Sequence, residues 1–405
     1  MNANRVAAPS VGLALLLLLA LLTALDAMAI DMYLPGMPAL AADFGVDAGR
    51  IQQTLSIFLA GLAIGQGLYG PLLDRFGRRL PLLLGIGVFV LGSVLAALAS
   101  SVEWLLAARF LQALGAAAGL VSPRAIVADL CDMKESASIF SLLMQVMMIA
   151  PIVAPLLGGY LLEHGGWRFI FWTLAVMGTI GLIWGWRLLP DSLPVDQRVA
   201  LNMGSIWRAY GRQLRHITFL LYALAGGVIL GSLFTYISAS AFVFTEYYGL
   251  TPTQFSYVFA ANSVALVLGG ALSNQLLKRG VEARNAMLVG MALHGLAGAL
   301  LAGLTLFGEP TLLLYSALLA VAVGALGLIF GNVTALTMAC AGRQVGVASA
   351  LMGVLHYLVA AVIGYAVSLA PQGASTLPIA IALCGGAALL ISLQVSRPRH
   401  APMAA

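Results

Sequence analysis

Apolar runs of about twenty residues follow one another along almost the whole chain, separated by short polar breaks. A helix needs roughly 20 apolar residues to cross the hydrocarbon core of a bilayer. Only 9% of the 405 residues are charged and 61% are hydrophobic, which leaves too little polar surface for a water-soluble domain. The chain is therefore predicted to be nearly all membrane domain, with no room for a sizeable soluble catalytic or nucleotide-binding unit.

The polar breaks divide the chain into twelve predicted membrane-spanning helices. They lie near residues 11–36, 51–72, 80–100, 104–128, 138–161, 168–189, 216–245, 254–276, 285–307, 310–337, 344–369 and 376–396. The longest polar stretch separates six spans from six. We therefore predict an all-α membrane protein with an N-terminal six-helix bundle at 1–189, a cytoplasmic linker with an amphipathic helix at 190–215, and a C-terminal six-helix bundle at 216–405.

Lysines and arginines fall almost entirely on one side of these spans. With the N-terminus inside, seventeen of the 20 face the cytoplasm, Arg50 and Arg168 lie outside, and Arg109 lies within a span. Because cytoplasmic loops carry an excess of positive charge, both termini are predicted to be cytoplasmic. The same bias accounts for the net charge of +5, so no nucleic-acid partner is indicated. The N-terminal apolar run continues past a signal-like Ala27-Met28-Ala29 and is interpreted as a first span.

Several kinds of chemistry have no support in the sequence. The three cysteines are scattered without metal-ligand spacing, so no metal site is expected. Neither of the two lysines follows a glycine, so the chain contains no phosphate-binding loop for ATP. The motifs of membrane metalloproteases and serine hydrolases are also missing, and no enzyme activity is expected.

Three charged residues lie inside predicted spans, where charge is costly and marks a functional hypothesis. Asp31 lies in the first span, where a desolvated carboxylate could take and release a proton as water or a cation approaches. The alternative is a static salt bridge. Asp26 is five residues earlier, about 140° around the helix, so the two acids do not share a face. It either faces the cavity alone or bonds a neighbouring helix.

Arg109 is the third charged residue, and it shares a helix face with Gln112. Nearby Gly115 permits close helix approach. An unpaired guanidinium would be strongly unfavourable here, so a carboxylate or backbone partner is expected, with Asp31 as the candidate. Movement of this cation toward and away from Asp31 would switch the proton affinity of the carboxylate. The alternative is a structural pin between spans.

The segment Gly70–Arg79 carries the most specific motif, with members Gly70, Asp74, Arg75, Gly77, Arg78 and Arg79. Gly70 is expected to permit close packing and Gly77 a tight turn. Ion pairs of Asp74 and the arginines are expected to latch the cytoplasmic side closed, with Asp129 as partner of Arg75 or Arg78. Simple anchoring by positive charge is the alternative, but it does not explain Asp74.

Span five contains two prolines one turn apart, followed by two glycines: Pro151, Pro155, Gly158 and Gly159. Prolines bend a helix and small residues let it pack closely, so this span is expected at the interface of the two halves, or as an ordinary kink. Polar and adaptable side chains nearby are pocket candidates. They are Tyr33, Gln112, Gln145, Met147, Tyr236, Asn262 and His356.

On these residues the sequence resembles the major facilitator superfamily. Gly70–Arg79 is similar to its signature between spans two and three, the segment Arg109 to Gly115 to its span-four motif, and Ala150–Gly159 to the antiporter motif of its drug exporters. A closer resemblance, strongest in the N-terminal half, is to the Bcr/CflA drug-resistance family. It rests on Asp31–Pro35, Gln53–Ser56, Arg109–Gln112, Arg124–Val127 with Asp129, Ala150–Gly159, Gly166–Arg168 and Gly346–Leu351.

The resemblance implies a major facilitator fold and a proton-coupled exporter of drugs such as bicyclomycin, chloramphenicol-type compounds or sulfonamides in the bacterial inner membrane. The family's span-one acid and span-four arginine correspond to Asp31 and Arg109. The proton gradient would be the energy source, with no cofactor. His356 and Tyr357 stand where the family often has Leu and Gln, which leaves the substrate range open.

Other functions of the same fold stay open on the sequence. They are export of a metabolite, peptide or metallophore, proton-driven uptake, and a sensor or channel without coupled transport. The expected partners are amphipathic small molecules, protons and the lipid bilayer. A monomer is expected, because one chain contains both halves of a complete cavity.

Overall fold

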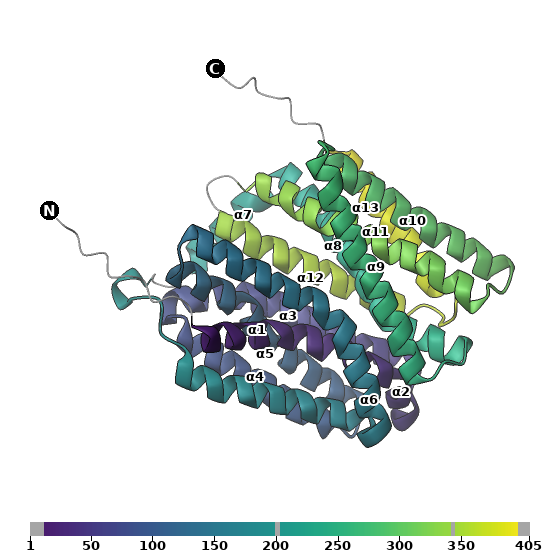
Figure 1. Ribbon diagram of the computed structural model, residues 1–405, viewed down its shortest axis with the longest axis horizontal. Coiled ribbons are helices and arrows are strands. Elements are labelled where there is room, and N and C mark those ends of the chain that lie inside the picture. The colour runs from purple at the N-terminus through teal and green to yellow at the C-terminus, as the bar shows by residue number, and fades with distance from the viewer. Residues whose placement is uncertain (1–11, 199–202, 342–344, 396–405) are drawn as a thin grey trace, which may run out of the picture.

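The computed structural model describes residues 12–198, 203–341 and 345–395, and every regular element within them is a helix (Figure 1). The helices of the first half are α1 (Leu13–Asp31), η1 (Leu34–Gly36), α2 (Met37–Phe44), α3 (Ala48–Phe76), α4 (Arg79–Ala97), α5 (Val102–Leu130) and α6 (Met133–Leu188). Between the halves lie η2 (Val195–Gln197) and α7 (Met203–Leu214). The second half contains α8 (Ile217–Phe242), η3 (Val243–Tyr247), α9 (Pro252–Lys278), α10 (Ala283–Phe307), α11 (Leu312–Ala339), α12 (Val345–Ser368) and α13 (Thr376–Leu393).

Twelve membrane crossings follow from these helices. Eleven helical segments are long and apolar enough to span a bilayer. One of them, α6, has 56 residues and would extend about 80 Å if straight, far more than one bilayer needs. Gly166, with φ 71° and ψ 179°, breaks the helical backbone within α6. Counting the two parts of α6 separately gives the twelve predicted spans.

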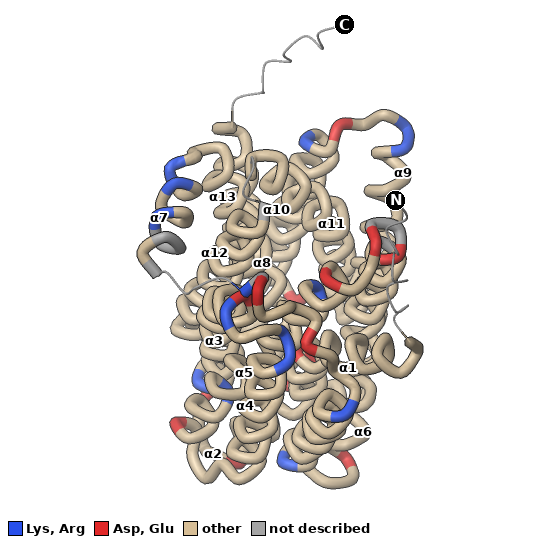
Figure 2. The backbone as a smooth tube through the Cα atoms, turned by 90° about the vertical axis from the view of Figure 1, so that its left-hand side faces the viewer, with Lys and Arg blue, Asp and Glu red and all other residues tan. Residues whose placement is uncertain are grey.

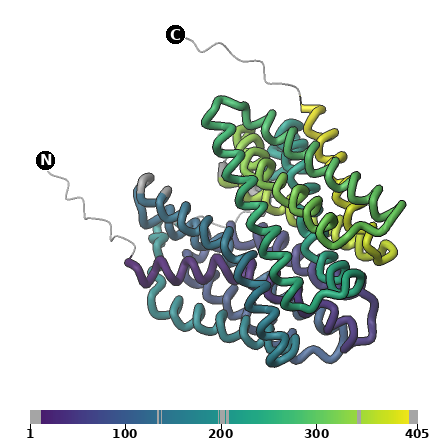
Figure 3. Tube along the Cα trace, turned by 45° about the vertical axis from the view of Figure 1, so that its right-hand side comes forward, coloured from purple at the N-terminus to yellow at the C-terminus, as the bar shows by residue number. Residues whose placement is uncertain are grey.

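The crossings before and after the linker form two separate bundles, as Figures 1 and 3 show. Within the first, α5 packs on α3 and α4, while α6 packs on α1 and α4. Within the second, α8 packs on α12 and α13, while α11 packs on α9 and α10. Small residues allow this closeness: a Cβ on Gly115 of α5 would lie 2.2 Å from the backbone nitrogen of Phe89 on α4. The predicted role of Gly115 in close helix approach is confirmed.

The two bundles meet mainly along two seams, α3 against α12 and α6 against α9. We call the end with the α3–α4 turn, α7 and the α9–α10 turn the basic end, and the opposite end, with α2, the far end. Cross-bundle bonds cluster towards the far end: Gln52 donates to Gln372 at 2.8 Å, and Thr253 donates to Glu163. Figure 1 shows the ribbons of the bundles diverging from there towards the basic end.

Along the α6–α9 seam, Met148 and Leu268, nearer the basic end, are 45% and 63% exposed. The described bonds between α6 and α9 lie further towards the far end. On the other seam, α3 and α12 stay close as far as Gln66 and Gly353, where a Cβ on Gly353 would lie 2.0 Å from Oε1 of Gln66.

Many of the described basic residues gather at the basic end, whereas Arg5, Arg343, Arg397 and Arg399 lie outside the described residues. Figure 2 shows Lys and Arg in α7, in the α3–α4 turn and in the α9–α10 turn, all at the basic end. Helix α7 is the predicted amphipathic helix, and it packs on α8 and α12. Its Gln213 donates to the carbonyl oxygen of Cys340 at 3.4 Å, so the helix is attached to the second bundle. The termini, 1–11 and 396–405, and part of the linker, 199–202, lie outside the described residues.

Candidate functional site

Asp31 is the last residue of α1, where the first span changes course. The sequence predicts one helix over 11–36, but α1 ends at Asp31 and a 3-10 turn begins at Leu34. Pro35 explains the change, because it lacks a backbone N–H and cannot continue the helical hydrogen bonding. Asp31 is 4% exposed, and its Oδ1 has no hydrogen-bond partner among the described residues. The backbone break therefore places a buried carboxyl group at a helix end.

Asp26 lies one and a half turns earlier on the same helix and is 3% exposed. Its Oδ1 also has no hydrogen-bond partner. The two acids have different neighbours. Asp31 is close enough to Tyr236 on α8 to interact with it electrostatically. Asp26 is similarly close to Arg124 on α5 and to Tyr357 on α12. Both acids thus approach the second bundle, but at separate places.

Arg109 on α5 is fully buried and held entirely within the first bundle. Its Nη1 donates to the carbonyl oxygen of Ala29 at 3.0 Å and to Oε1 of Gln112 at 2.6 Å. Its guanidinium carbon lies 4.2 Å from the ring centre of Phe58 and 4.8 Å from that of Tyr33. Aromatic faces attract a cation, so these rings stabilise the charge in the absence of a carboxylate.

The predicted direct ion pair between Arg109 and Asp31 is wrong for this conformation. Among the described residues, Arg109 forms no salt bridge, and its Nε and Nη2 have no hydrogen-bond partner. A backbone partner for Arg109 was the other expectation, and the carbonyl of Ala29 is that partner. The physical reason is the end of α1: its last carbonyls lack intrahelical donors and can accept from a nearby cation.

Two predicted pocket residues lie beneath this guanidinium, in the core of the first bundle. Tyr33 is fully buried, and its hydroxyl is hydrogen-bonded to Thr54. Gln112 is also fully buried and donates to the hydroxyl of Ser93 at 2.8 Å. Neither side chain presents surface to a ligand in this conformation. Both instead fix the position of Arg109.

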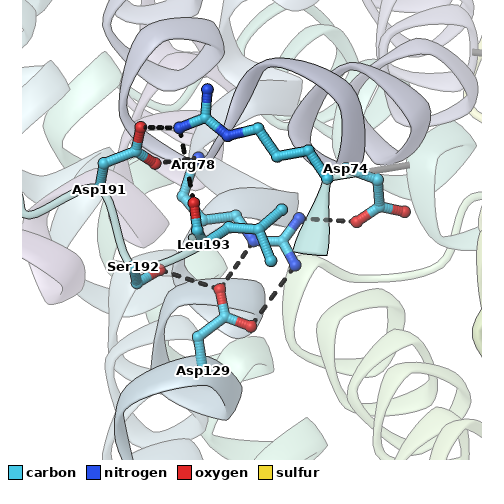
Figure 4. A network of polar contacts seen from close by, with 7 residues as sticks. Asp74, Arg78, Asp129, Asp191, Ser192 and Leu193 are labelled. Carbon is cyan, nitrogen blue, oxygen red and sulfur yellow. Dashed lines mark hydrogen bonds and ion pairs between the residues drawn. The ribbon is translucent and has the colours of Figure 1, made fainter. Parts of the chain in front are cut away.

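Arg78 is the centre of the motif at the α3–α4 turn (Figure 4). Its Nε donates to Asp129 at 2.8 Å and its Nη1 to Asp74 at 2.7 Å, which confirms Asp129 as a partner of Arg78. Burial alone would lower the pKa of Arg78, but the hydrogen bonds to Asp129 and Asp74 outweigh it and raise that pKa. The arginine stays charged and ties α3 to the end of α5.

The same network includes the beginning of the linker, as Figure 4 shows. Ser192 donates to Asp129 at 2.9 Å, and Asp191 accepts from the backbone N–H of Arg78 at 3.0 Å. Gly77 has a φ of 86°, and a Cβ there would lie 2.4 Å from Asp191. Gly77 therefore makes the predicted tight turn and also leaves room for this carboxylate. The described bonds join the first bundle to its own linker and do not latch one bundle to the other.

The remaining motif residues are placed differently from the prediction. A Cβ on Gly70 would meet no heavy atom within 4 Å, so the close packing expected there is not present in this conformation. Arg79 donates to the backbone carbonyl of Trp186 at 2.5 Å, which attaches the start of α4 to the end of α6. Arg75 is exposed at the end of α3.

The proline–glycine segment of α6 lies on the seam between the bundles. A Cβ on Gly158 would lie 1.9 Å from the carbonyl oxygen of Met32, and one on Gly159 would lie 2.9 Å from Oγ of Ser256. Ser256 also donates to the carbonyl of Pro155 at 2.9 Å. The two glycines therefore let α6 touch the end of α1 on one side and α9 on the other, at the interface where the sequence predicted this span.

The other pocket candidates lie on both bundles. Asn262 donates to the hydroxyl of Tyr236 at 3.1 Å, and both are almost fully buried on the second bundle. His356 packs on Gly226 of α8, and its Nε2 has no hydrogen-bond partner. Gln145 is exposed and Met147 half-buried on α6. Tyr236 and His356 thus carry polar groups on helices that face α1 or α3.

Sequence reasoning missed several residues of this region. Ser256 and Ser263 on α9 both donate to carbonyls of α6, and their spacing of seven residues places them on one helix face. That spacing was visible in the sequence. The proximity of Arg124 and Tyr357 to Asp26 was not, because it depends on how three separate helices pack.

Two six-helix bundles, joined by a linker, with buried carboxyl groups between them, define a helical membrane transporter. The family model of the Major Facilitator Superfamily matches residues 19–365. The chain belongs to this superfamily, whose members are transporters, and it is a multi-pass membrane protein.

Its relatives include drug-resistance proteins, in agreement with the resemblance noted from the motifs. The chain is 35% identical over 354 residues to an uncharacterized MFS-type transporter, YdgK, of Bacillus subtilis, with 87% of each chain covered. It is 29% identical over 349 residues to a bicyclomycin resistance protein homolog of Haemophilus influenzae, covering 86% of this chain and 87% of that one. It is 35% identical over 268 residues to a chloramphenicol resistance protein of Pseudomonas aeruginosa, covering 66% and 62%.

A solved structure has the same overall fold at much lower identity. The crystal structure of a D-xylose-proton symporter matches with a TM-score of 0.76 and 13% identity, covering 94% of this chain and 96% of that one. At this identity the likeness concerns the fold alone.

Proposed function

We propose that the protein is a drug:proton antiporter that exports small amphipathic antibiotics, such as bicyclomycin, chloramphenicol-type compounds or sulfonamides, by alternating access. The observation that carries the proposal is Asp31, a buried carboxyl group at the end of α1 that forms no ion pair within the part of the chain that the structure describes. A carboxylate that is costly to leave charged, and close to the second bundle through Tyr236, is suited to exchange a proton for a substrate. The drug-resistance relatives support the substrate class.

The transport cycle follows from the two ends of the molecule. If positive charge marks the cytoplasmic side, the basic end faces the cytoplasm and opens there in the inward-open state. A substrate entering from there displaces the proton of Asp31. After the bundles rock, the far end opens, the substrate leaves, and Asp31 takes a proton from outside. The proton gradient supplies the energy, and Asp26 is a second proton-binding group on the same path.

Arg109 acts as the electrostatic switch of this cycle. In the described conformation it binds the carbonyl of Ala29 rather than Asp31. A shift of α1 against α5 would break that bond and bring the guanidinium towards the carboxylate, which favours release of its proton. Asp31 and Arg109 both lie on the first bundle, so a single chain contains both groups of the proposed switch. The protein is proposed to work as a monomer in the bacterial inner membrane, with both termini cytoplasmic.

Proteoliposomes with an imposed pH gradient test the proposal. Adding bicyclomycin, chloramphenicol or a sulfonamide should release protons through the wild type, but not through Asp31→Asn. Asp43→Asn is the matched control, because Asp43 is an acid of the same segment that pairs with Arg168 at the far end. Equal proton fluxes for wild type and Asp31→Asn would refute the coupling role. Drug flux without proton movement would refute antiport.

A further inference from the structure

A groove on the membrane-facing surface lies across the α3–α12 seam, away from the two buried acids. Its volume is about 390 Å³. The first bundle contributes α3 and Leu106 of α5, and the second contributes α12. Along α3 the lining extends from Arg50 to Ala60, ten residues or roughly 15 Å of helix. The groove is thus long and narrow, and it runs along the helices in the direction of the membrane normal.

The open side of the groove faces the bilayer. Leu358, Val362 and Tyr365 line it, with 47%, 62% and 52% of their surfaces exposed. Their spacing of four and three residues places them on one face of α12. Exposed apolar side chains in this stripe of a membrane-spanning helix contact lipid chains rather than water. The floor of the groove therefore suits a hydrocarbon chain.

Arg50 lines the far end of the groove, and Glu103 lies beside the lining through its ion pair with Arg50. Arg50 donates to Glu103 on α5 at 2.9 Å and to Gln53 at 2.6 Å. The side chains of Arg50 and Glu103 are 37% and 67% exposed, so both can reach a ligand. A guanidinium has five N–H groups and a fork geometry that matches phosphate. A carboxylate beside it matches a protonated amine.

We propose that this groove binds one phospholipid with a primary amine in its headgroup, of the phosphatidylethanolamine class. The phosphate binds Arg50, the ammonium group binds Glu103, and one acyl chain lies along α3 and α12. The lipid comes from the leaflet at the far end. Because the groove is made by both bundles, the bound lipid stabilises the conformation in which they touch at that end. This site does not depend on which compound the protein exports.

Native mass spectrometry of the full-length protein tests the site. The protein is stripped of lipid and titrated with phosphatidylethanolamine, phosphatidylglycerol or phosphatidylcholine. Wild type should retain one phosphatidylethanolamine in preference to the other two. Arg50→Gln should bind it about tenfold more weakly, as expected for loss of a charge-assisted hydrogen bond. Arg168→Gln is the matched control, because Arg168 is an arginine of the same end that pairs with Asp43 and does not line the groove.

Two further variants test the headgroup contact and the acyl-chain contact separately. Glu103→Gln should remove the preference for phosphatidylethanolamine over phosphatidylglycerol while keeping phosphate binding. Ala60→Phe should fill the floor and weaken binding of all three lipids, with an unchanged melting temperature in detergent. Equal binding by wild type and Arg50→Gln, or equal losses in Arg50→Gln and Arg168→Gln, would overturn the site. Displacement of the lipid by an exported drug at its transport concentration would also overturn it, by showing that the groove is a substrate path.

Discussion

Arg109 donates its Nη1 hydrogen bond to the backbone carbonyl oxygen of Ala29, 3.0 Å away and two residues before Asp31. That carbonyl is in the last turn of α1, where the helix leaves its final acceptors without donors and carries a partial negative charge. The guanidinium therefore caps the helix that ends in Asp31. It fixes the position of the acid through the backbone and leaves the carboxyl group itself unpaired.

This cap predicts that lysine cannot replace arginine at position 109. A lysine ammonium is a point charge that does not stack on the rings of Phe58 and Tyr33 as the planar guanidinium does. Arg109→Lys should lower proton-coupled transport about tenfold or more, which is the loss expected when a desolvated cation–π contact of about 2 kcal/mol is removed. Proton release in proteoliposomes measures this. Full transport by the lysine variant would show that charge alone is sufficient.

Asp129 and Asp74 both accept from Arg78, but they should differ in their contribution to stability. The side chain of Asp129 is 19% exposed and accepts from Arg78 and Ser192, whereas that of Asp74 is 59% exposed and accepts from Arg78 alone. Asp129→Asn should destabilise the protein by about 1–3 kcal/mol, the range for hydrogen bonds to charged groups. Asp74→Asn should cost about 1 kcal/mol or less, as exposed pairs do. Thermal unfolding in detergent gives the order, and a larger effect of Asp74→Asn would contradict it.

Gly158 and Gly70 provide a matched pair of glycines in signature motifs. An alanine at 158 would clash with the carbonyl oxygen of Met32, whereas one at 70 would meet no heavy atom within 4 Å. Gly158→Ala should strongly lower the melting temperature. Gly70→Ala should leave it unchanged or raise the stability by about 0.5–1 kcal/mol, since alanine favours a helix interior. If Gly70 is needed only when the basic end closes, Gly70→Ala will stay folded but transport poorly. An unstable Gly70→Ala variant would contradict this.

The fold could be predicted from the sequence because bilayer thickness fixes the length of an apolar helix. Twelve apolar runs and one long polar stretch were sufficient to give two bundles of six. The segment around Gly166 shows where apolar length alone is not sufficient. Helix α6 continues through this segment, and only the positive φ of Gly166 separates its two crossings. The end of α1 at Asp31 was missed for a similar reason, since the apolar pattern continues unbroken past Pro35.

The site was predicted in part. Asp129 was predicted to pair with Arg75 or Arg78 at the cytoplasmic ends of their spans, and the bond to Arg78 is present. The partner of Arg109 was not found, because a backbone carbonyl has no signature in the sequence. Tyr33 was predicted to line the substrate pocket. The turn after α1 instead directs its ring beneath Arg109.

The bond between Ser263 and Pro151 leads to the last prediction. Pro155 has no N–H, so the carbonyl of Pro151, four residues earlier, has no donor within α6. The hydroxyl of Ser263 on α9 lies 3.3 Å from that oxygen, across the seam between the bundles, and 3.0 Å from the carbonyl oxygen of Phe259 on its own helix, so its proton is shared between the two acceptors. Ser263→Ala should therefore leave the partly buried carbonyl of Pro151 without a donor and cost about 1 kcal/mol in the wild type.

A second substitution tests whether the proline is the cause. Pro155→Ala supplies an intrahelical N–H to the carbonyl of Pro151 and removes its need for Ser263. In that background, Ser263→Ala should cost almost nothing, so the two changes should show a coupling energy of about 1 kcal/mol in a double-mutant cycle. Ser256→Ala is the control, because Ser256 donates to the carbonyl of Pro155, which an α-helix can satisfy without it. Its cost should be the same with and without the proline. Equal costs of Ser263→Ala in both backgrounds would show that the serine does not compensate for the missing donor.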